Sequence, residues 1–258
     1  MDITTPTLDD PGPWVAIRNG VLAGLAMLAL LLPPGAPRPD GGARQLTASR
    51  EVAPLRQAEL GGVDASNDMR HMANWIASSG DHAAMPFVVI DKRAARLYVF
   101  DAQARLQDHT AVLLGSAHGD DSVPGIGEKA IADVLPEERT TPAGRFKGQR
   151  GLNIIGEDVV WVDYDAAVSM HRVRTTQPKE RRLQRLASDT TDDNRISYGC
   201  INIPAAFFDA HIAPTFSVHR AMVYVLPEQK SLQTVFGVQV PGPLPTEQAQ
   251  GHLTQMIR

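Results

Sequence analysis

The spacing of apolar residues first predicts one amphipathic helix, near residue 70. The stretch 66–78 (SNDMRHMANWIAS) begins with residues that cap helices and places Met69, Met72 and Ile76 on one helical face. Gly80 follows the last turn, where glycine commonly ends a helix. We therefore expect a single amphipathic helix ahead of the next, differently patterned part of the chain.

Beyond Pro86 the pattern changes to short runs rich in β-branched and aromatic residues. Six predicted strands lie at 87–90, 96–100, 110–115, 158–164, 167–171 and 221–226. Turn signals and irregular loops separate them, which argues against a parallel sheet of βαβ units and favours an antiparallel sandwich or barrel. Two inserted helices are expected to begin at Pro178 and Pro204. The predicted fold class is a mainly β sandwich with a few short helices.

An uncharged apolar run occupies residues 21–32, directly after a segment containing Arg18. Twelve residues are few for a membrane-spanning helix, which needs about 20, and the length matches the core of an export signal. A buried core helix would need polar positions at helical spacing, and the run has none. Residues 1–36 are therefore predicted to be a signal peptide or membrane anchor, whose cleavage before Pro37 is left open.

The composition divides the remaining chain into three parts. Residues 37–85 are predicted to hold a linker and the amphipathic helix, because 33–43 contain four prolines and three glycines. Residues 86–228 are predicted to form the β-rich domain. Residues 229–258 are predicted to be a C-terminal tail, since prolines interrupt a polar sequence there.

Charge and cysteine content exclude several function classes. The 258 residues carry 25 basic and 29 acidic side chains, a net charge of −4, so no general field for binding nucleic acid surrounds the protein. The single cysteine excludes an internal disulfide and any multi-thiolate metal site. The stretch 118–121 (HGDD) lacks a companion histidine spacing, so we expect neither a metal nor another cofactor.

Cys200 is the candidate nucleophile. Gly199 before it allows close approach of a substrate carbonyl, and a helix starting near Pro204 would favour the thiolate through its positive end. The candidate base is His171, at the end of the predicted strand 167–171. From these residues alone, an inert buried cysteine and a hydrogen-bonded structural histidine remain open alternatives.

Three motifs in order resemble the catalytic domain of the L,D-transpeptidases, the YkuD-like family. They are residues 141–146 (TPAGRF), then Met170-His171, then residues 197–202 (SYGCIN). The family carries a TPxGxF segment, a strand-end histidine and an SHGC signature, and the resemblance spans about 86–227. It implies a β-rich sandwich acting on peptidoglycan stem peptides in the periplasm or elsewhere in the cell envelope, exported or anchored by the N-terminal segment.

The resemblance also implies a mechanism. Cys200 would attack the carbonyl of the third residue of a tetrapeptide stem, expel the terminal D-Ala and form a thioester. His171 would take the thiol proton and later activate the acceptor amine, while the backbone carbonyl of Arg172 orients the imidazole. The backbone N–H groups of Tyr198, Gly199 and Cys200 would form an oxyanion hole.

The same resemblance assigns roles to two further residues. The sequence also departs from the family pattern in two places. Ser197 and Asn202 are implied to bind the substrate or to hold the local turn. Tyr198 stands where the family has histidine, and 25 residues, rich in charge, separate His171 from Ser197. That insert, 172–196, reads either as a solvated, self-compensating helix or as a lid in which Arg181 and Arg182 bind substrate carboxylates.

Three functions are weighed on this basis. The leading hypothesis is a transpeptidase that cross-links stem peptides. An L,D-carboxypeptidase or endopeptidase would use the same chemistry with water as acceptor. The third is a non-catalytic module that binds the envelope, in which Tyr198 marks a lost activity.

Overall fold

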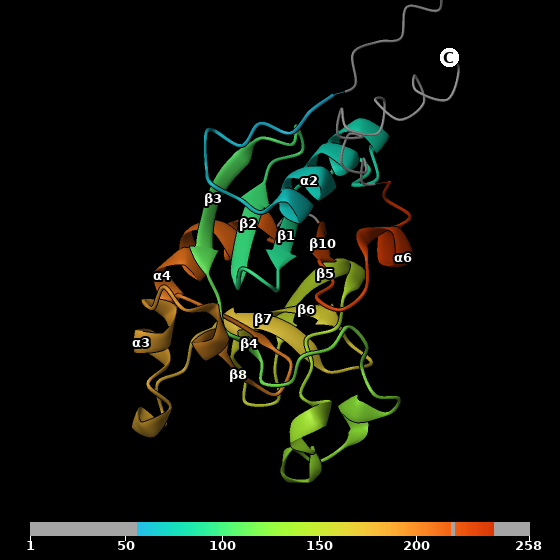
Figure 1. Cartoon of the computed structure of the whole chain (residues 1–258). Helices are drawn as coiled ribbons and strands as arrows, with labels where there is room; N and C mark the ends of the chain where they lie inside the picture. The colour runs from blue at the N-terminus through green and yellow to red at the C-terminus, as the bar shows by residue number, and fades with distance from the viewer. Residues whose placement is uncertain (1–55, 218–219, 240–258) are drawn as a thin grey trace, which may run out of the picture. The chain divides into compact units, whose positions relative to one another are not determined.

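The computed structural model describes residues 56–217 and 220–239 (Figure 1). The predicted signal or anchor segment, 1–36, and most of the predicted tail lie outside the described residues. Within the described part, no helix is long and apolar enough to span a membrane.

An eight-stranded mixed sheet dominates the described residues, in the order β3-β2-β1-β10-β5-β6-β7-β9 (Figure 1). Its strands are β1 (Phe87–Asp91), β2 (Arg96–Phe100), β3 (Leu106–Ala111), β5 (Gly144–Leu152), β6 (Asp158–Asp163), β7 (Val168–Arg172), β9 (Ile201–Ile203) and β10 (Ala221–Val225). Strands β4 (Leu114–Gly115) and β8 (Arg195–Ser197) form a second, two-stranded sheet. Strand β5 joins the halves of the large sheet, because Gly144–Gly148 pair with β10 and Gln149–Leu152 pair with β6.

The helices are few and short except for α2 (Asn67–Ser79). Ser66 caps its first turn by accepting a hydrogen bond from the Met69 N–H, and Gly80 ends it in the left-handed conformation. The others are α3 (Arg182–Leu186), α4 (Ala205–Phe207), a π-helical turn (Phe208–Ile212), α5 (Ala213–Thr215) and α6 (Leu232–Phe236). Single 3₁₀ turns lie at Ile126–Glu128, Ile131–Asp133, Pro136–Glu138, Pro178–Glu180 and Thr191–Asn194.

Two hydrophobic cores lie on opposite faces of β1, β2 and β10. The first core packs residues of these strands, such as Val88 and Val223, with Val160 and Met170 of β6 and β7. The second core packs the alternate residues of β1, β2 and β10 against α2 and α6. Strands with apolar residues on both faces explain the continuous apolar runs in the sequence. The first core thus brings the two halves of the sheet face to face, as in a sandwich.

The predicted class, mainly β with a few short helices, is confirmed, and so is the helix near residue 70. The expectation of an antiparallel arrangement is wrong at three pairs: β1 with β10, β7 with β9, and β4 with β8 are parallel. The run 110–115 is divided between the end of β3 and β4, and the helix expected from Pro178 is broken at Arg181. Strand β5 was missed because its sequence, GRFKGQRGL, is mostly polar and exposed.

Candidate active site

Strands β7 and β9 bring the candidate base and nucleophile to one face of the sheet. They pair in parallel, with Met170 opposite Ile201 and His171 opposite Asn202. Side chains alternate along a strand, so Met170 and Ile201 enter the first core while His171 and Cys200 lie on the other face. The register therefore places His171 on β7 and Cys200, directly before β9, on the same side of the sheet.

The Cys200 thiol is half-buried and contacts β7 and the turn before it. Its Sγ lies 3.7 Å from the Ser169 Oγ and donates to the Ala167 carbonyl oxygen at 3.6 Å. Ser169 is two residues before His171 on the same strand face. In the described residues no hydrogen bond joins the sulfur to the imidazole, so the thiol would have to turn from Ala167 towards His171 for a proton to pass.

The imidazole of His171 is held in one tautomer. Its Nδ1 lies 2.8 Å from the carbonyl oxygen of Arg172, and because a carbonyl only accepts, Nδ1 is the donor. The lone pair of the neutral ring is therefore on Nε2. Burial lowers the pKa of His171 below its ordinary value of 6.5, and Arg174 and Arg182 act in the same direction, against the Arg172 hydrogen bond. The ring is thus a neutral base at pH 7.

The turn before Cys200 is shaped by Gly199 and Ser197. Gly199 has φ of +122°, a conformation that L side chains rarely adopt. The Ser197 hydroxyl accepts from the Gly199 N–H at 3.1 Å and donates to the Cys200 carbonyl at 2.6 Å. The Gly199 N–H is therefore occupied within the turn, and an oxyanion hole that needs no rearrangement would use the N–H groups of Tyr198 and Cys200.

We expect Gly199→Ala to lose both activity and stability. An added Cβ would lie 2.7 Å from the backbone oxygen of Thr140, closer than real contacts, and the positive φ adds strain of about 1–3 kcal/mol. Urea unfolding measures the loss of stability. The control is Gly156→Ala, because Gly156 also has a positive φ but an added Cβ there would meet no atom within 4 Å. Equal destabilisation of the two variants would contradict the steric argument.

Asn202 and Ser197 lie beneath the turn rather than at its surface. Asn202 is 1% exposed, and its side-chain amide donates to the Cys200 carbonyl at 3.2 Å. Its Oδ1 accepts from Arg182 at 2.5 Å. Of the two roles expected for Asn202, the geometry matches support of the turn, and the buried Ser197 has the same role.

Two contacts around the turn were missed by the sequence analysis. The Arg139 guanidinium stacks over the Tyr198 ring, 4.1 Å from its centroid. The Thr141 hydroxyl donates to the Gly199 carbonyl at 2.8 Å and accepts from the Gly115 N–H at 2.9 Å. Thr141 belongs to the TPAGRF segment, so the motif itself was the signal, but its spacing did not reveal the partner.

Three arginines of the insert are paired with acids. Arg172 contacts Asp209, Arg174 contacts Glu157, and Arg182 contacts Glu180. Of these three pairs, only Arg182 with Glu180 lies within residues 172–196, so the insert compensates its own charge in part. The other two pairs join the start of the insert to the residue directly before β6 and to the π-helical turn. Arg181 is exposed, whereas Arg182 is committed to Asn202 and Glu180.

No family model matches the chain, and no curated protein matches it. Solved structures that are similar to it include an L,D-transpeptidase mutant from Enterococcus faecium, with 17% identity, TM-score 0.32, and coverage of 55% of this chain and 50% of that chain. The cell-shape-determining protein Pgp2 from Campylobacter jejuni is 16% identical over 57% of this chain and 49% of that chain, with TM-score 0.38. An L,D-transpeptidase from Mycobacterium smegmatis is 14% identical over 55% and 58%, with TM-score 0.31.

The chain spans about half the length of the first two of these structures. In the part of the chain that the structure describes, no group of three or more His, Cys, Asp or Glu side chains is placed to hold a metal ion.

Proposed function

We propose that this protein is a cysteine-dependent acyltransferase that acts on peptidoglycan stem peptides and forms cross-links between them. The observation that carries the proposal is the common face of His171 on β7 and Cys200 directly before the paired strand β9. It is supported by the Arg172 carbonyl, which holds the Nδ1 proton of His171 and leaves Nε2 as the base. The three motifs that resemble the L,D-transpeptidases indicate the substrate class.

The proposed reaction divides one acyl transfer into two steps. His171 takes the thiol proton, and the Cys200 sulfur attacks the carbonyl carbon of the third stem residue. The bond to the terminal D-Ala breaks, its nitrogen takes the proton from the imidazolium, and a thioester remains. An acceptor amine then attacks the thioester and loses a proton to His171. As the new amide bond forms, the carbon–sulfur bond breaks, and the Cys200 sulfur takes that proton to become a free thiol again.

The substrate places the proposed site of action in the cell envelope. Polymerised peptidoglycan lies outside the cytoplasmic membrane, and the apolar run 21–32 has the length of an export signal core. Export or anchoring through this segment is therefore part of the proposal. Export is measured by fusing alkaline phosphatase behind this protein, with and without residues 1–36. Phosphatase activity outside the cytoplasm is expected only when residues 1–36 are present.

Purified protein incubated with tetrapeptide muropeptides is expected to release D-Ala and give cross-linked dimers. Mass spectrometry of the products and of the protein follows both steps, and a carbapenem is expected to add covalently to Cys200. Cys200→Ala is expected to lose the adduct and the dimers. A protein whose Cys200 thiol is intact but which gives neither dimers nor hydrolysed peptides would contradict the proposal.

The two other functions are separated by the same experiment. Free tripeptide stems without dimers would identify water as the acceptor and replace cross-linking by carboxypeptidase activity. A non-catalytic binding module would give no carbapenem adduct, and the wild type and Cys200→Ala would bind peptidoglycan sacculi equally well.

A further inference from the structure

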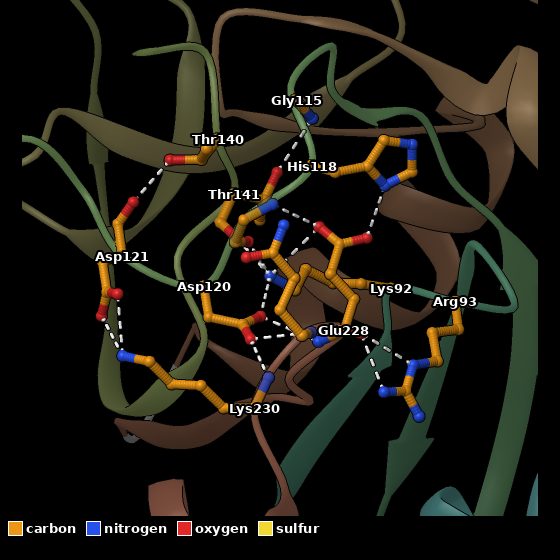
Figure 2. A network of polar contacts seen from close by, with 12 residues as sticks. Lys92, Arg93, Gly115, His118, Asp120, Asp121, Thr140, Thr141, Glu228 and Lys230 are labelled. Carbon is orange, nitrogen blue, oxygen red and sulfur yellow. Dashed lines mark hydrogen bonds and ion pairs between the residues drawn. The ribbon is translucent and has the colours of Figure 1, made fainter. Parts of the chain in front are cut away.

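A buried ion cluster is connected through Thr141 to the turn that holds Cys200. It contains Lys92, directly after β1, and Asp120, Arg195 and Glu228. Figure 2 shows Lys92, Asp120 and Glu228 of this cluster. The Lys92 and Asp120 side chains are 0% and 1% exposed, and those of Arg195 and Glu228 are 7% and 5% exposed. Two cations and two anions thus share one site, and their charges balance.

Lys92 is the centre of this cluster and reaches beyond it. Its ammonium group donates to the Asp120 carboxylate at 2.8 Å, to the Gly119 carbonyl, and to the Thr141 carbonyl at 2.9 Å. Three acceptors match the three N–H groups of an ammonium. Asp120 is itself fixed, because it accepts the backbone N–H groups of residues 228–230. Lys92 is therefore rigidly placed and holds the Thr141 backbone.

Thr141 connects Lys92 to the turn that holds Cys200. The fully buried Thr141 hydroxyl donates to the Gly199 carbonyl at 2.8 Å. That carbonyl and the Cys200 N–H belong to the same planar peptide unit, so fixing the direction of one fixes the other. The Gly199 N–H is bound to Ser197, which makes the Cys200 N–H a remaining donor for an oxyanion.

We propose that Lys92 and Thr141 are positioning residues that orient the Cys200 N–H as an oxyanion donor. Neither residue touches the substrate; each acts through the Gly199–Cys200 peptide. The proposal rests on the proposed function, since an oxyanion arises only when Cys200 attacks a carbonyl. Without the Thr141 hydroxyl, the Gly199 carbonyl loses its hydrogen-bond donor and the orientation of the peptide relaxes.

The test compares two reactions of the same thiol. Opening of a carbapenem ring by the Cys200 sulfur develops an oxyanion, whereas displacement of iodide from iodoacetamide does not. Thr141→Val is expected to slow acylation about 10- to 100-fold and to leave the rate and pH profile of alkylation unchanged. Thr141→Ser, which keeps the hydroxyl, is expected to restore acylation. A Thr141→Val protein that acylates at the wild-type rate, or loses both reactions equally, overturns the proposal.

Lys92 is tested in the same assay. Lys92→Met is expected to slow acylation without changing alkylation, and its effect is expected to add little to that of Thr141→Val, because both act on one peptide. Circular dichroism checks that the variant folds. If it does not, Asp120→Asn, which keeps the ammonium and weakens its anchor, is expected to give a smaller loss of acylation. Fully additive effects, or no loss in a folded variant, overturn the role of Lys92.

A readout without turnover separates this proposal from the proposed function. The amide resonance of Cys200 and the carbonyl resonance of Gly199 are expected to shift in Thr141→Val and to stay in place in Thr141→Ser. If these resonances do not move, the link through Thr141 is wrong even in an active enzyme. If wild-type Cys200 is alkylated but acylated by neither carbapenem nor muropeptides, the proposed function fails and the oxyanion role falls with it.

Discussion

A His171→Gln variant is expected to lose about 10²- to 10⁴-fold in the rate of acyl transfer, the usual contribution of a positioned base. Glutamine keeps a donor and much of the volume of the ring, but it cannot take the thiol proton. The pKa of His171 is lowered by burial, so in the wild type the neutral ring persists to a pH below 6.5. The acid limb of kcat/KM is therefore expected below that value and is expected to disappear in the variant.

The control for this prediction is His109→Gln. His109 lies on β3, at the opposite edge of the large sheet from β9, and contacts Arg96. Its replacement is expected to change neither the rate nor the pH profile of acylation. A His171→Gln protein that retains the wild-type rate and acid limb would show that another group takes the thiol proton.

The register between β7 and β9 explains how far the sequence could lead to this site. The pattern of residues 167–171 predicted a strand ending at His171, and the strand β7 (Val168–Arg172) confirms it within one residue. The three residues of β9 are too few for a recognisable period, so the pattern did not predict a strand at Ile201–Ile203. The common face of Cys200 and His171 depends on that parallel pairing, which is a property of the tertiary fold.

The contacts of the ion cluster were harder to predict from the sequence. Lys92 and Glu228 are 136 positions apart, and charged residues in a sequence are normally read as exposed. Nothing local distinguishes Lys92 from the neighbouring Arg93, whose side chain is 54% exposed. Burial of Lys92 follows from the packing of β1 against β10, which brings the segment after each strand together. Charge pairing at such separations is determined by the fold and not by spacing.

The ion cluster also leads to the largest expected loss of stability, in Lys92→Met. Methionine has a similar length but no charge, so the buried Asp120 carboxylate would lose the ammonium that it pairs with, whereas Glu228 would keep Arg195. Removing one partner of a buried ion pair costs about 3–5 kcal/mol of unfolding free energy. Urea denaturation at neutral pH measures this loss. Lys129→Met is the matched control, because Lys129 pairs with Glu138 at 2.7 Å but is 38% exposed, and it is expected to cost about 0–1 kcal/mol.

The loss in Lys92→Met is expected to depend on pH. Burial alone would raise the pKa of Asp120, but the Lys92 hydrogen bond and three backbone N–H groups lower it to about 2, from 3.8. A carboxyl with a lowered pKa contributes stability above its ordinary pKa and loses it as the pH falls through the folded value. The wild type therefore loses the Asp120 contribution, about 2 kcal/mol, as the pH falls from 3.8 to about 2. Because a protonated Asp120 no longer needs the ammonium, the difference between wild type and Lys92→Met is expected to shrink over the same range. A difference that stays constant, or that matches Lys129→Met at neutral pH, would show that the Lys92 charge does not stabilise the cluster.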